Sequence, residues 1–410
     1  MTSRTTRISI VGGGLSGLYA AFLLDQQGIH DWVLLESRAT LGGRILSLSV
    51  GSDTTTPTEV APRDRFDLGP TWFWPDLQPE LTRLIATLGL ECFDQHETGD
   101  MVVEHTPPNP PQRRRGYAST PAAVRLMGGM AALVDAMTHQ LDPTRIHTGH
   151  TVRALLLSDD HVTLTCAGPD GVTKDWQAGQ VLLALPPRLT AQTLRYEPAL
   201  PDELLRHWRD TPTWMAPHAK FLAVYDRPFW RDKGLSGEAR SARGPMVEIH
   251  DASTPGGRGA LFGFVGVPAR VRQGLADGLL QTHCLAQLVR LFGDDAAAPR
   301  ATFLKDWSCD LQTATAADLD ATGQHVSAPA VTPAAGPWHG RLAGIASEWS
   351  PQFPGYLAGC VDAAGAGVRA LVKPVNQSSP NLIRRATSPH LRESVAATAA
   401  ACSGLDPTTT

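Results

Sequence analysis

Apolar and polar positions alternate in blocks over the first forty residues. Residues 7–14, RISIVGGG, form a β-branched apolar run that breaks into glycine, and LSGLYAAFLLDQQG continues with helical spacing and closes at Gly28. A second apolar run, WVLLES, covers residues 32–37. Parallel strands need a crossover connection, so this order of strand, helix and strand predicts the beginning of a parallel sheet.

Further elements follow from the same periodicity. Residues 79–90, PELTRLIATLGL, have the spacing of an amphipathic helix. Residues 162–176 alternate and turn at Asp170 and Gly171, which is typical of a hairpin. Residues 180–187, QVLLALPP, form a continuous apolar run, which is typical of a buried strand. The hairpin and this strand therefore belong with a sheet.

Three further segments are predicted from the spacing of their apolar residues or from its loss. Residues 271–292 are predicted as one amphipathic helix, with Leu279 among the residues that face inward and Gly293 at its end. The proline- and arginine-rich residues 105–121 predict an exposed loop. Residues 374–410 lose the apolar pattern, which predicts a mobile tail.

Composition narrows the classes of function. The chain has 410 residues, 42% of them hydrophobic, which is enough for two domains with cores of their own. A formal net charge of -4 provides no basic field for nucleic acid or an anionic membrane. The six cysteines are scattered without disulfide or metal spacing, and no segment has the pattern of a signal peptide or a membrane span. We expect a soluble cytoplasmic protein that acts on a small molecule, with no metal site.

A glycine-rich turn joins the first predicted strand to the first helix. Gly12, Gly14 and Gly17 form GxGxxG there, and Glu36 ends the second strand. Such glycines permit a tight turn, close approach of a pyrophosphate and close packing of helix on sheet, while the acid accepts hydrogen bonds from a ribose and disfavours NADP. The alternative is a glycine turn beside a surface glutamate. The predicted dinucleotide-binding residues are Gly12, Gly14, Leu15, Ser16, Gly17, Glu36, Ser37 and Arg38.

The residues after Glu36 carry a family resemblance. ESRATLGGRILS resembles the ExRxxxGGR signature of the flavin-containing amine oxidase superfamily, which includes monoamine and L-amino-acid oxidases. FDLGPTWFWP, RLMGGMAALVDAM, HTVRALLL and VLLALPP are similar to further segments of that family, in the same order. The resemblance implies FAD in place of a diffusible nicotinamide. It also implies cofactor contacts by Gly43, Arg44, Gly69, Pro70, Thr71 and the backbone of Val152.

Two segments resemble the parts of the family that lie against the flavin ring. Lys220 precedes Phe229 by nine residues, as does the family lysine that holds a water against flavin N5, and burial would lower its pKa. A surface lysine on an edge strand is the alternative. Trp307 is similar to a tryptophan that packs near the isoalloxazine. Covalent-flavin members have a cysteine nine positions later, where this chain has Ala316, so we expect non-covalent FAD. The position after that cysteine usually carries an aromatic residue that forms one wall of an aromatic cage. This chain has Ala317 there, so the resemblance does not provide that wall.

The segment EWSPQFPGYLAG resembles the family's closing loop. Glu348 and Tyr356 keep its spacing of eight residues. The resemblance implies that Gly355 and the amides of Tyr356 and Leu357 begin a helix that points at the flavin. Glu348 would accept hydrogen bonds from the ribityl or pyrophosphate side, and Tyr356 would present its ring to the substrate. A helix cap with a packing tyrosine is the alternative.

The resemblance implies a reaction as well as a cofactor. FAD would remove a hydride from the carbon beside an amine, giving an imine, and oxygen would then yield hydrogen peroxide. The aromatic candidates beside the substrate are Trp72, Phe73, Trp74 and Tyr356. Trp72 replaces the arginine that binds carboxylate in the amino-acid oxidases, which favours an amine. An L-amino-acid oxidase, a flavin desaturase, a renalase-like oxidase and a non-enzymatic FAD-bearing binding protein stay open. The predicted catalytic residues are Trp72, Lys220, Trp307 and Tyr356.

These elements predict an α/β fold in two parts. A discontinuous Rossmann-like FAD-binding domain would comprise residues 1–75, 122–190 and 318–373, and an inserted α+β substrate domain residues 76–121 and 191–317. Family members carry a longer helical segment before the returning glycine motif. The pocket is therefore expected to be shallow, or to be roofed by a partner or by the tail. A small-molecule amine and oxygen are the predicted partners, and a homodimer stays open.

Overall fold

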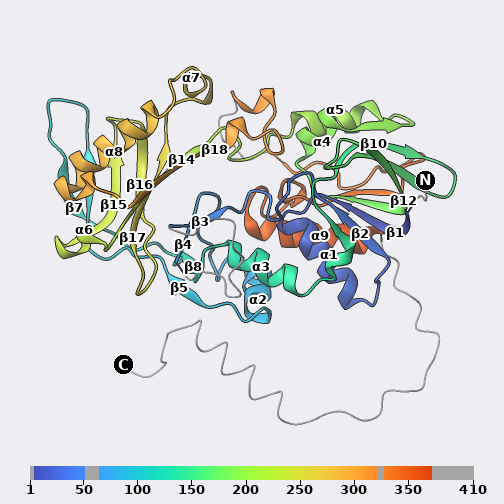
Figure 1. The fold of residues 1–410 in the computed structure, drawn as a ribbon, viewed down its shortest axis with the longest axis horizontal. Helices are drawn as coiled ribbons and strands as arrows, with labels where there is room; N and C mark the ends of the chain where they lie inside the picture. The colour runs from blue at the N-terminus through green and yellow to red at the C-terminus, as the bar shows by residue number, and fades with distance from the viewer. Residues whose placement is uncertain (1–3, 51–63, 321–326, 372–410) are drawn as a thin grey trace, which may run out of the picture.

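Two large sheets lie at opposite ends of an elongated molecule (Figure 1). The computed structural model describes residues 4–50, 64–320 and 327–371. The predicted tail at 374–410 lies outside the described residues. None of the helices in the described residues has the length and apolar character needed to cross a membrane.

The first sheet contains the predicted strand–helix–strand unit. Its strands, in spatial order, are β13 (Arg195–Glu197), β10 (Thr151–Leu157), β11 (Val162–Ala167), β12 (Thr173–Leu183), β1 (Arg4–Val11), β2 (Trp32–Leu35) and β9 (Ile146–His147), with β19 (Leu342–Gly344) also paired to β12. β1 runs parallel to both β2 and β12, while β11 and β12 form the predicted antiparallel hairpin. The parallel sheet and the buried strand are thereby confirmed.

Helices cover one face of this sheet. They are α1 (Leu15–Gln26), α2 (Pro79–Thr87), α3 (Ala131–His139) and α9 (Leu357–Leu371). Ile8 and Ile10 of β1 point into this core, as strand alternation requires. Val33 and Leu35 of β2 point to the opposite face, where they share a core with the β10–β11 hairpin and α5 (Asp202–Asp210). The first sheet is thus buried on both faces, which explains its apolar strand sequences.

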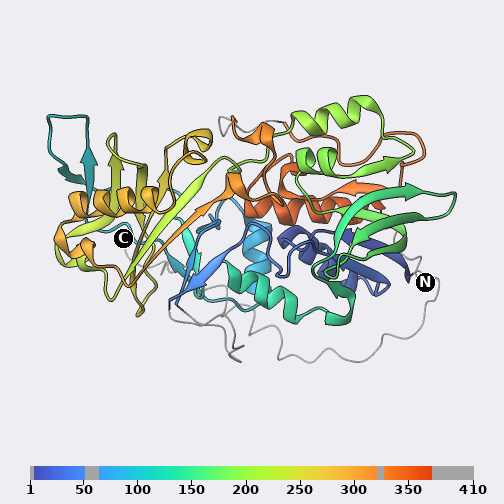
Figure 2. The ribbon, with the colours of Figure 1, turned by 45° about the horizontal axis from the view of Figure 1, so that its top comes forward.

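The second sheet is built from later segments of the chain. Its strands, in spatial order, are β18 (Ala301–Asp306), β14 (Ala219–Tyr225), β17 (Gly259–Val265), β16 (Met246–Asp251), β15 (Leu235–Ser241), β6 (Asp100–Glu104) and β7 (Gln112–Arg115). Helix α8 (Leu279–Phe292) packs across one face (Figure 2). The other face, with Leu222 and Phe262, packs on Phe66 and Leu68 from the first part of the chain. This face of the second sheet is therefore covered by the segment around β4 (Arg65–Asp67), which is not a strand of the first sheet.

Short elements complete the described chain. β3 (Ser47–Ser49) pairs with β4 (Arg65–Asp67), and β5 (Cys92–Asp94) pairs with β8 (Val124–Leu126). Short helices include α4 (Pro187–Thr193), α6 (Phe229–Asp232) and α7 (Ala269–Arg272), with 3-10 turns at Pro143–Arg145, Asp294–Ala297, Trp307–Cys309, Ala316–Asp318 and Ser347–Trp349. β13 pairs with β10, so this strand belongs to the first sheet although the proposed domain boundary lies at 190. The other boundaries stay a proposal.

Two predicted elements are wrong. The single helix over residues 271–292 is two helices, α7 and α8, because Gly278 between them has a left-handed φ of 75°. Leu279 is 41% exposed and does not face inward, while Gly293 does end α8. The predicted loop at 105–121 contains β7, whose backbone pairs with β6 while its arginines are exposed.

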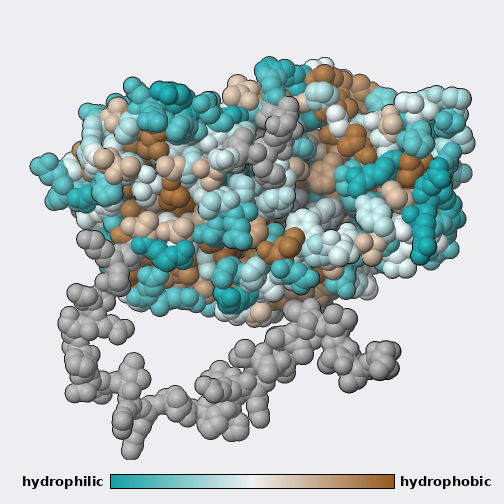
Figure 3. All heavy atoms as spheres, turned by 180° about the vertical axis from the view of Figure 1, so that it is seen from behind, coloured by the Kyte–Doolittle hydropathy of each residue, from teal (hydrophilic) through white to brown (hydrophobic). Residues whose placement is uncertain are grey.

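The surface leaves the question of a homodimer open. Seen from behind, hydrophobic residues gather in small groups among hydrophilic ones (Figure 3). Scattered apolar side chains of this kind are ordinary on a soluble monomer. This face therefore identifies no partner surface among the described residues.

Candidate cofactor and substrate site

A cavity of about 420 Å³ lies where residues of the two sheets meet. Its walls combine the carboxyl ends of β1 and β2, the segment after β4, the start of β14 and the start of α9. Of the predicted catalytic and cofactor-binding residues, all except Gly17 and Glu348 line it. The predicted residues that line it are Gly12, Gly14, Leu15, Ser16, Glu36, Ser37, Arg38, Gly43, Arg44, Gly69, Pro70, Thr71, Trp72, Val152, Lys220, Trp307, Gly355, Tyr356 and Leu357.

The glycine turn at the cavity has no room for side chains. Gly12 has a φ of 109°, and a Cβ on Gly17 would stand 2.0 Å from the Gly12 carbonyl oxygen. Helix α1 begins immediately afterwards, with Gly14 as its N-cap and no side chain that caps its amides. Free amides at a helix N-terminus bind anions, and the missing side chains let a phosphate approach the backbone. This end of the cavity suits a pyrophosphate.

Glu36 fixes the turn from the end of β2. It is 3% exposed, which excludes the alternative of a surface glutamate. One carboxylate oxygen accepts a hydrogen bond from the Gly13 amide at 2.6 Å, and the other accepts from the amide of Arg38 at 2.7 Å and the hydroxyl of Ser37 at 3.2 Å. The carboxylate also lines the cavity, where a ribose hydroxyl can donate to it.

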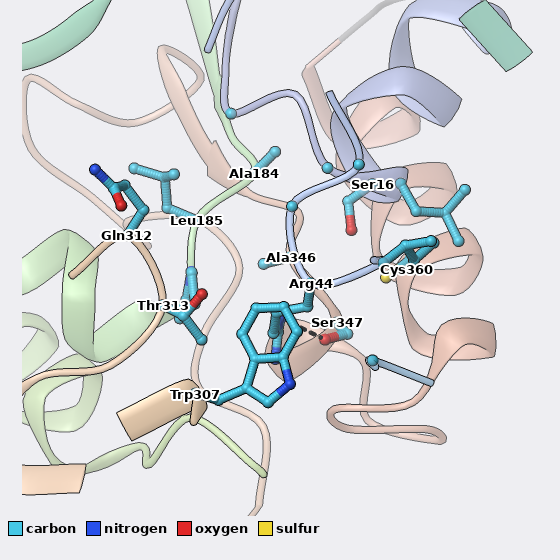
Figure 4. A pocket seen from close by; sticks show the side chains of 18 of the residues that line it. Ser16, Arg44, Ala184, Leu185, Trp307, Gln312, Thr313, Ala346, Ser347 and Cys360 are labelled. Atoms are coloured by element: carbon cyan, nitrogen blue, oxygen red, sulfur yellow. Dashed lines mark hydrogen bonds between the residues drawn. The ribbon is translucent and has the colours of Figure 1, made fainter. Parts of the chain in front are cut away.

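Arg44 and Glu348 pair with each other. The guanidinium donates to both carboxylate oxygens, at 2.5 and 3.0 Å, and to the Ser347 hydroxyl at 3.1 Å (Figure 4). Glu348 is 2% exposed and does not line the cavity. Its predicted contact with the cofactor therefore stays a prediction, and its observed partner is Arg44. Removal of Arg44 would leave Glu348 as a buried charge without its ion-pair partner.

Lys220 reaches the cavity from the second sheet. Strand alternation turns Ala219 and Phe221 toward the core under α8 and turns Lys220 to the opposite face. Its ammonium donates to the Thr71 hydroxyl and to the Gly69 carbonyl at 3.3 Å. The strand lies between β17 and β18, and the lysine is 3% exposed. Both observations exclude the alternative of a surface lysine on an edge strand.

Burial changes the acid–base behaviour of Lys220. Desolvation lowers its pKa to about 7, with Asp67 opposing the shift and Arg125 adding to it. This direction confirms the effect of burial predicted from the sequence. Asp67 is itself buried, and it accepts hydrogen bonds from the Ser47 hydroxyl at 2.5 Å and the Met130 amide at 2.9 Å. Lys220 can thus gain or lose a proton near neutral pH.

Trp307 joins the two halves of the site. It follows β18, is buried, and its indole nitrogen donates to the Leu68 carbonyl at 3.0 Å. The ring lines the cavity (Figure 4). Lys220 and Trp307, from the second sheet, therefore both bond to the segment that follows β4. This segment is held on its second-sheet side by two separate side chains.

Tyr356 has aromatic rings on two sides. Its ring centroid is 4.6 Å from that of Trp214 and 6.1 Å from that of Trp74. Gly355 has a φ of 83°, and a Cβ there would lie 2.7 Å from the Cβ of Trp214. Glycine is thus required both by the turn and by the tryptophan. Trp72 also lines the cavity, with its ring 5.5 Å from Phe262.

The aromatic candidates need one correction and one addition. Phe73 is 1% exposed in the core beside α2 and does not line the cavity. Its backbone pairs with Val124, which turns its side chain away from Trp72 and Trp74. Trp214 was not predicted, although it is an aromatic residue shortly before Lys220. It provides an aromatic wall, which the alanine at 317 left in doubt.

Comparison with known proteins identifies the family. Residues 111–371, well over half of the chain, match the family model described as flavin containing amine oxidoreductase. The chain belongs to this family. Residues 10–88 also match a model described as an NAD(P)-binding Rossmann-like domain. The second match covers the last two residues of β1, the glycine turn, β2 and Glu36.

The relatives of this flavin-containing amine oxidoreductase include several oxidases. A putrescine oxidase of Kocuria rosea is 29% identical over 251 residues, 57% of this chain and 50% of the relative. A putative flavin-containing monoamine oxidase of Mycobacterium tuberculosis is 31% identical over 179 residues, 43% of this chain and 36% of the relative. The chain thus spans half or less of these curated relatives.

Solved structures show the same fold. A putrescine oxidase variant has a TM-score of 0.71 at 18% identity and covers 89% of this chain and 98% of its own. The cyclohexylamine oxidase of Brevibacterium oxydans has a TM-score of 0.70 at 17% identity, with coverages of 89% and 98%. The Rossmann-like domain with an added substrate domain is therefore confirmed.

FAD, the cofactor of this flavin-containing family, fits the residues present. The glycine turn and the uncapped start of α1 suit its pyrophosphate, and Glu36 suits a ribose. Val152 lines the same cavity, next to His150. Cys360 lines it too, but burial raises the pKa of its thiol, which makes the thiol a poor nucleophile. The non-covalent attachment of FAD stays a prediction.

Sequence reasoning missed several other lining residues. Gln312 and Thr313 lie across the view from Ser16 and Cys360 (Figure 4), and the Thr313 hydroxyl accepts from Arg38 at 3.2 Å. This loop has no distinctive sequence pattern. The polar and aromatic lining residues that were not predicted include Gln78, His150, Thr151, Arg153, Thr193, Trp214, His218, Phe264, Gln312, Thr313 and Ser347, whereas Trp74 was predicted and does line the cavity.

The segment between β4 and β8, where the resemblance predicted a shortened helical insert, extends the second sheet. Between β4 and β8 the chain forms α2, β5, β6 and β7. β6 runs parallel to β15, so the segment adds two strands to that sheet. The expectation of one helix followed by a loop was too simple. A roof supplied by a partner or by the tail stays a prediction.

Proposed function

We propose that this chain is an FAD-dependent oxidase that converts an amine to an imine and passes the electrons to oxygen, giving hydrogen peroxide. The observation that carries the proposal is the placement of Lys220. Its ammonium is buried, has a pKa of about 7 and bonds to Gly69 and Thr71 in the cavity that Trp307 and Tyr356 also line. The putrescine, monoamine and cyclohexylamine oxidases among its relatives support an amine as the substrate.

FAD supplies hydride acceptance when it is bound. The residues of this chain prepare the amine for that step. Trp74, Trp214 and Tyr356 give their end of the cavity an aromatic lining, against which a bound amine would lose contact with water. Desolvation lowers the pKa of an ammonium, so the neutral amine is favoured there. Lys220 can exchange a proton with water in the cavity near neutral pH.

Two measurements on the purified protein test this proposal. Acid precipitation should release a yellow supernatant with the absorbance of free FAD, which also tests non-covalent binding. Anaerobic addition of a primary amine should bleach the flavin absorbance, and air should restore it with formation of peroxide. The corresponding amino acids should be much poorer substrates, because Trp72 stands in place of the carboxylate-binding arginine. Flavin that no amine, amino acid or NADH reduces would instead indicate a binding protein.

Tyr356→Leu tests the role of the closing loop. The variant should keep its full FAD content and lose about tenfold or more in kcat/KM for amines, because the ring packed on Trp214 is removed while the backbone is kept. Flavin absorbance per protein and steady-state kinetics measure the two effects. Tyr117→Leu, at a 51% exposed site, is the control. Loss of flavin from Tyr356→Leu would show that the tyrosine is structural.

A further inference from the structure

Gln78 is a buried amide on the wall of the cavity. It lies immediately before α2, is 4% exposed and lines the cavity. Its position is fixed by Trp74 through two bonds. The backbone N–H of Gln78 donates to the Trp74 carbonyl at 2.9 Å. The side-chain oxygen of Gln78 accepts from the backbone N–H of Trp74 at 3.3 Å.

The side-chain nitrogen of Gln78, Nε2, is left without a partner in the part of the chain that the structure describes. No hydrogen bond is formed by the Gln78 Nε2 within residues 4–50, 64–320 and 327–371. The Nε2 atom is not among the buried side-chain atoms without a partner in the described residues, so it is open to the cavity, where a substrate oxygen can accept from it in place of water. A flip of the amide would not satisfy the group, because Nε2 would then face the Trp74 amide, which is also a donor.

The surroundings of Gln78 place it at the substrate end. The ring of Trp74, one helical turn away, packs edge-on against Tyr356. Glu36 is the one carboxylate among the described residues that line the cavity, and it belongs to the glycine turn at the other end. A second ammonium group on a substrate would therefore meet a donor at Gln78 instead of an acceptor.

We propose that Gln78 is a specificity residue that donates from Nε2 to a neutral oxygen of the substrate. The substrate class is then a monoamine whose apolar body carries an ether, hydroxyl or carbonyl oxygen away from the amine. Diamines are disfavoured, unlike in the putrescine oxidase relative. This inference rests on the proposed amine oxidase function.

The test compares ω-methoxyalkylamines, n-alkylamines and α,ω-diaminoalkanes of matched length with the FAD-loaded enzyme. Wild-type kcat/KM should be about tenfold or more higher for the methoxyamines than for the diamines. Gln78→Leu should remove the advantage of methoxyamines over alkylamines. Gln78→Glu keeps the acceptor for the Trp74 amide, replaces the donor by an anion and should invert the preference toward diamines by about tenfold or more.

Controls separate the possible failures. Gln192→Glu, exposed on α4, should leave all ratios unchanged. Flavin absorbance and the melting temperature show whether each variant is folded and loaded, and the near-isosteric Gln78→Glu serves if Gln78→Leu does not fold. Unchanged ratios in a loaded Gln78→Glu enzyme would overturn the inference. If the wild type turns over none of these amines, the proposed function fails, and calorimetric Kd ratios for the same compounds then decide the role of Gln78.

Discussion

Gly17→Ala should yield a folded protein that has lost its FAD. The added Cβ would stand 2.0 Å from the Gly12 carbonyl oxygen, so α1 or the turn must shift away from the position that suits a pyrophosphate. Loss of two hydrogen bonds from the turn to the charged pyrophosphate would cost about 3 kcal/mol, which is about a hundredfold in Kd. We expect the Kd for FAD, measured by fluorescence quenching with the deflavinated protein, to rise by about that factor or more.

Gly28→Ala provides a matched control at the other end of the same helix. Gly28 has a φ of 72°, and a Cβ there meets no atom within 4 Å. Alanine in this left-handed conformation should cost about 1–2 kcal/mol of stability and leave the Kd for FAD unchanged. Stoichiometric FAD in Gly17→Ala, at wild-type affinity, would contradict the glycine turn as the pyrophosphate site.

Lys220→Met should slow the reaction of the reduced enzyme with oxygen by about tenfold or more. A fixed charge at a reacting centre in a water-poor site has effects of at least this size. The pKa of Lys220 is lowered to about 7, so Nζ is positive below that pH and neutral above it. The wild-type rate should therefore fall as the pH rises from 6 to 8, and the variant should show no step in this range. Stopped-flow mixing with oxygen measures both effects.

The control for this experiment is Lys233→Met. Lys233 pairs with Asp295 at 2.6 Å, is partly exposed and does not line the cavity. Its removal should change neither the rate nor the pH profile. Equal oxygen rates for wild type and Lys220→Met would remove Lys220 from the oxygen reaction and leave it a structural link between Thr71 and the second sheet.

Short sequence motifs predicted those parts of the candidate site whose shape depends on the backbone of a few consecutive residues. The glycine turn, Glu36 and the turn at Gly355, just before α9, are short segments whose conformation their own residues dictate. Lys220 followed from family resemblance, and burial within a strand explains its shifted pKa. The overall α/β class followed from the order of strands and helices.

The side-chain positions that were not predicted from the sequence depend on contacts between residues far apart in the chain. Trp214 reaches Tyr356 from a segment more than a hundred residues away, and no periodicity encodes that contact. Phe73 could have been excluded, because alternation in an extended segment turns it opposite to Trp72 and Trp74. Gly278 is a signal for a break before α8. The prediction gave more weight to the apolar spacing and therefore continued the helix through this glycine.

The bonds from Lys220 and Trp307 to the segment after β4 have a thermodynamic consequence. They join the second sheet to residues 68–71, beside the cavity that FAD would occupy. A ligand that contacts both sides binds one relative orientation of the sheets and stabilises it by mass action. We therefore expect FAD binding to be coupled to the relative orientation of the two sides of the cavity. FAD would then stabilise the contact between them as well as take part in the reaction.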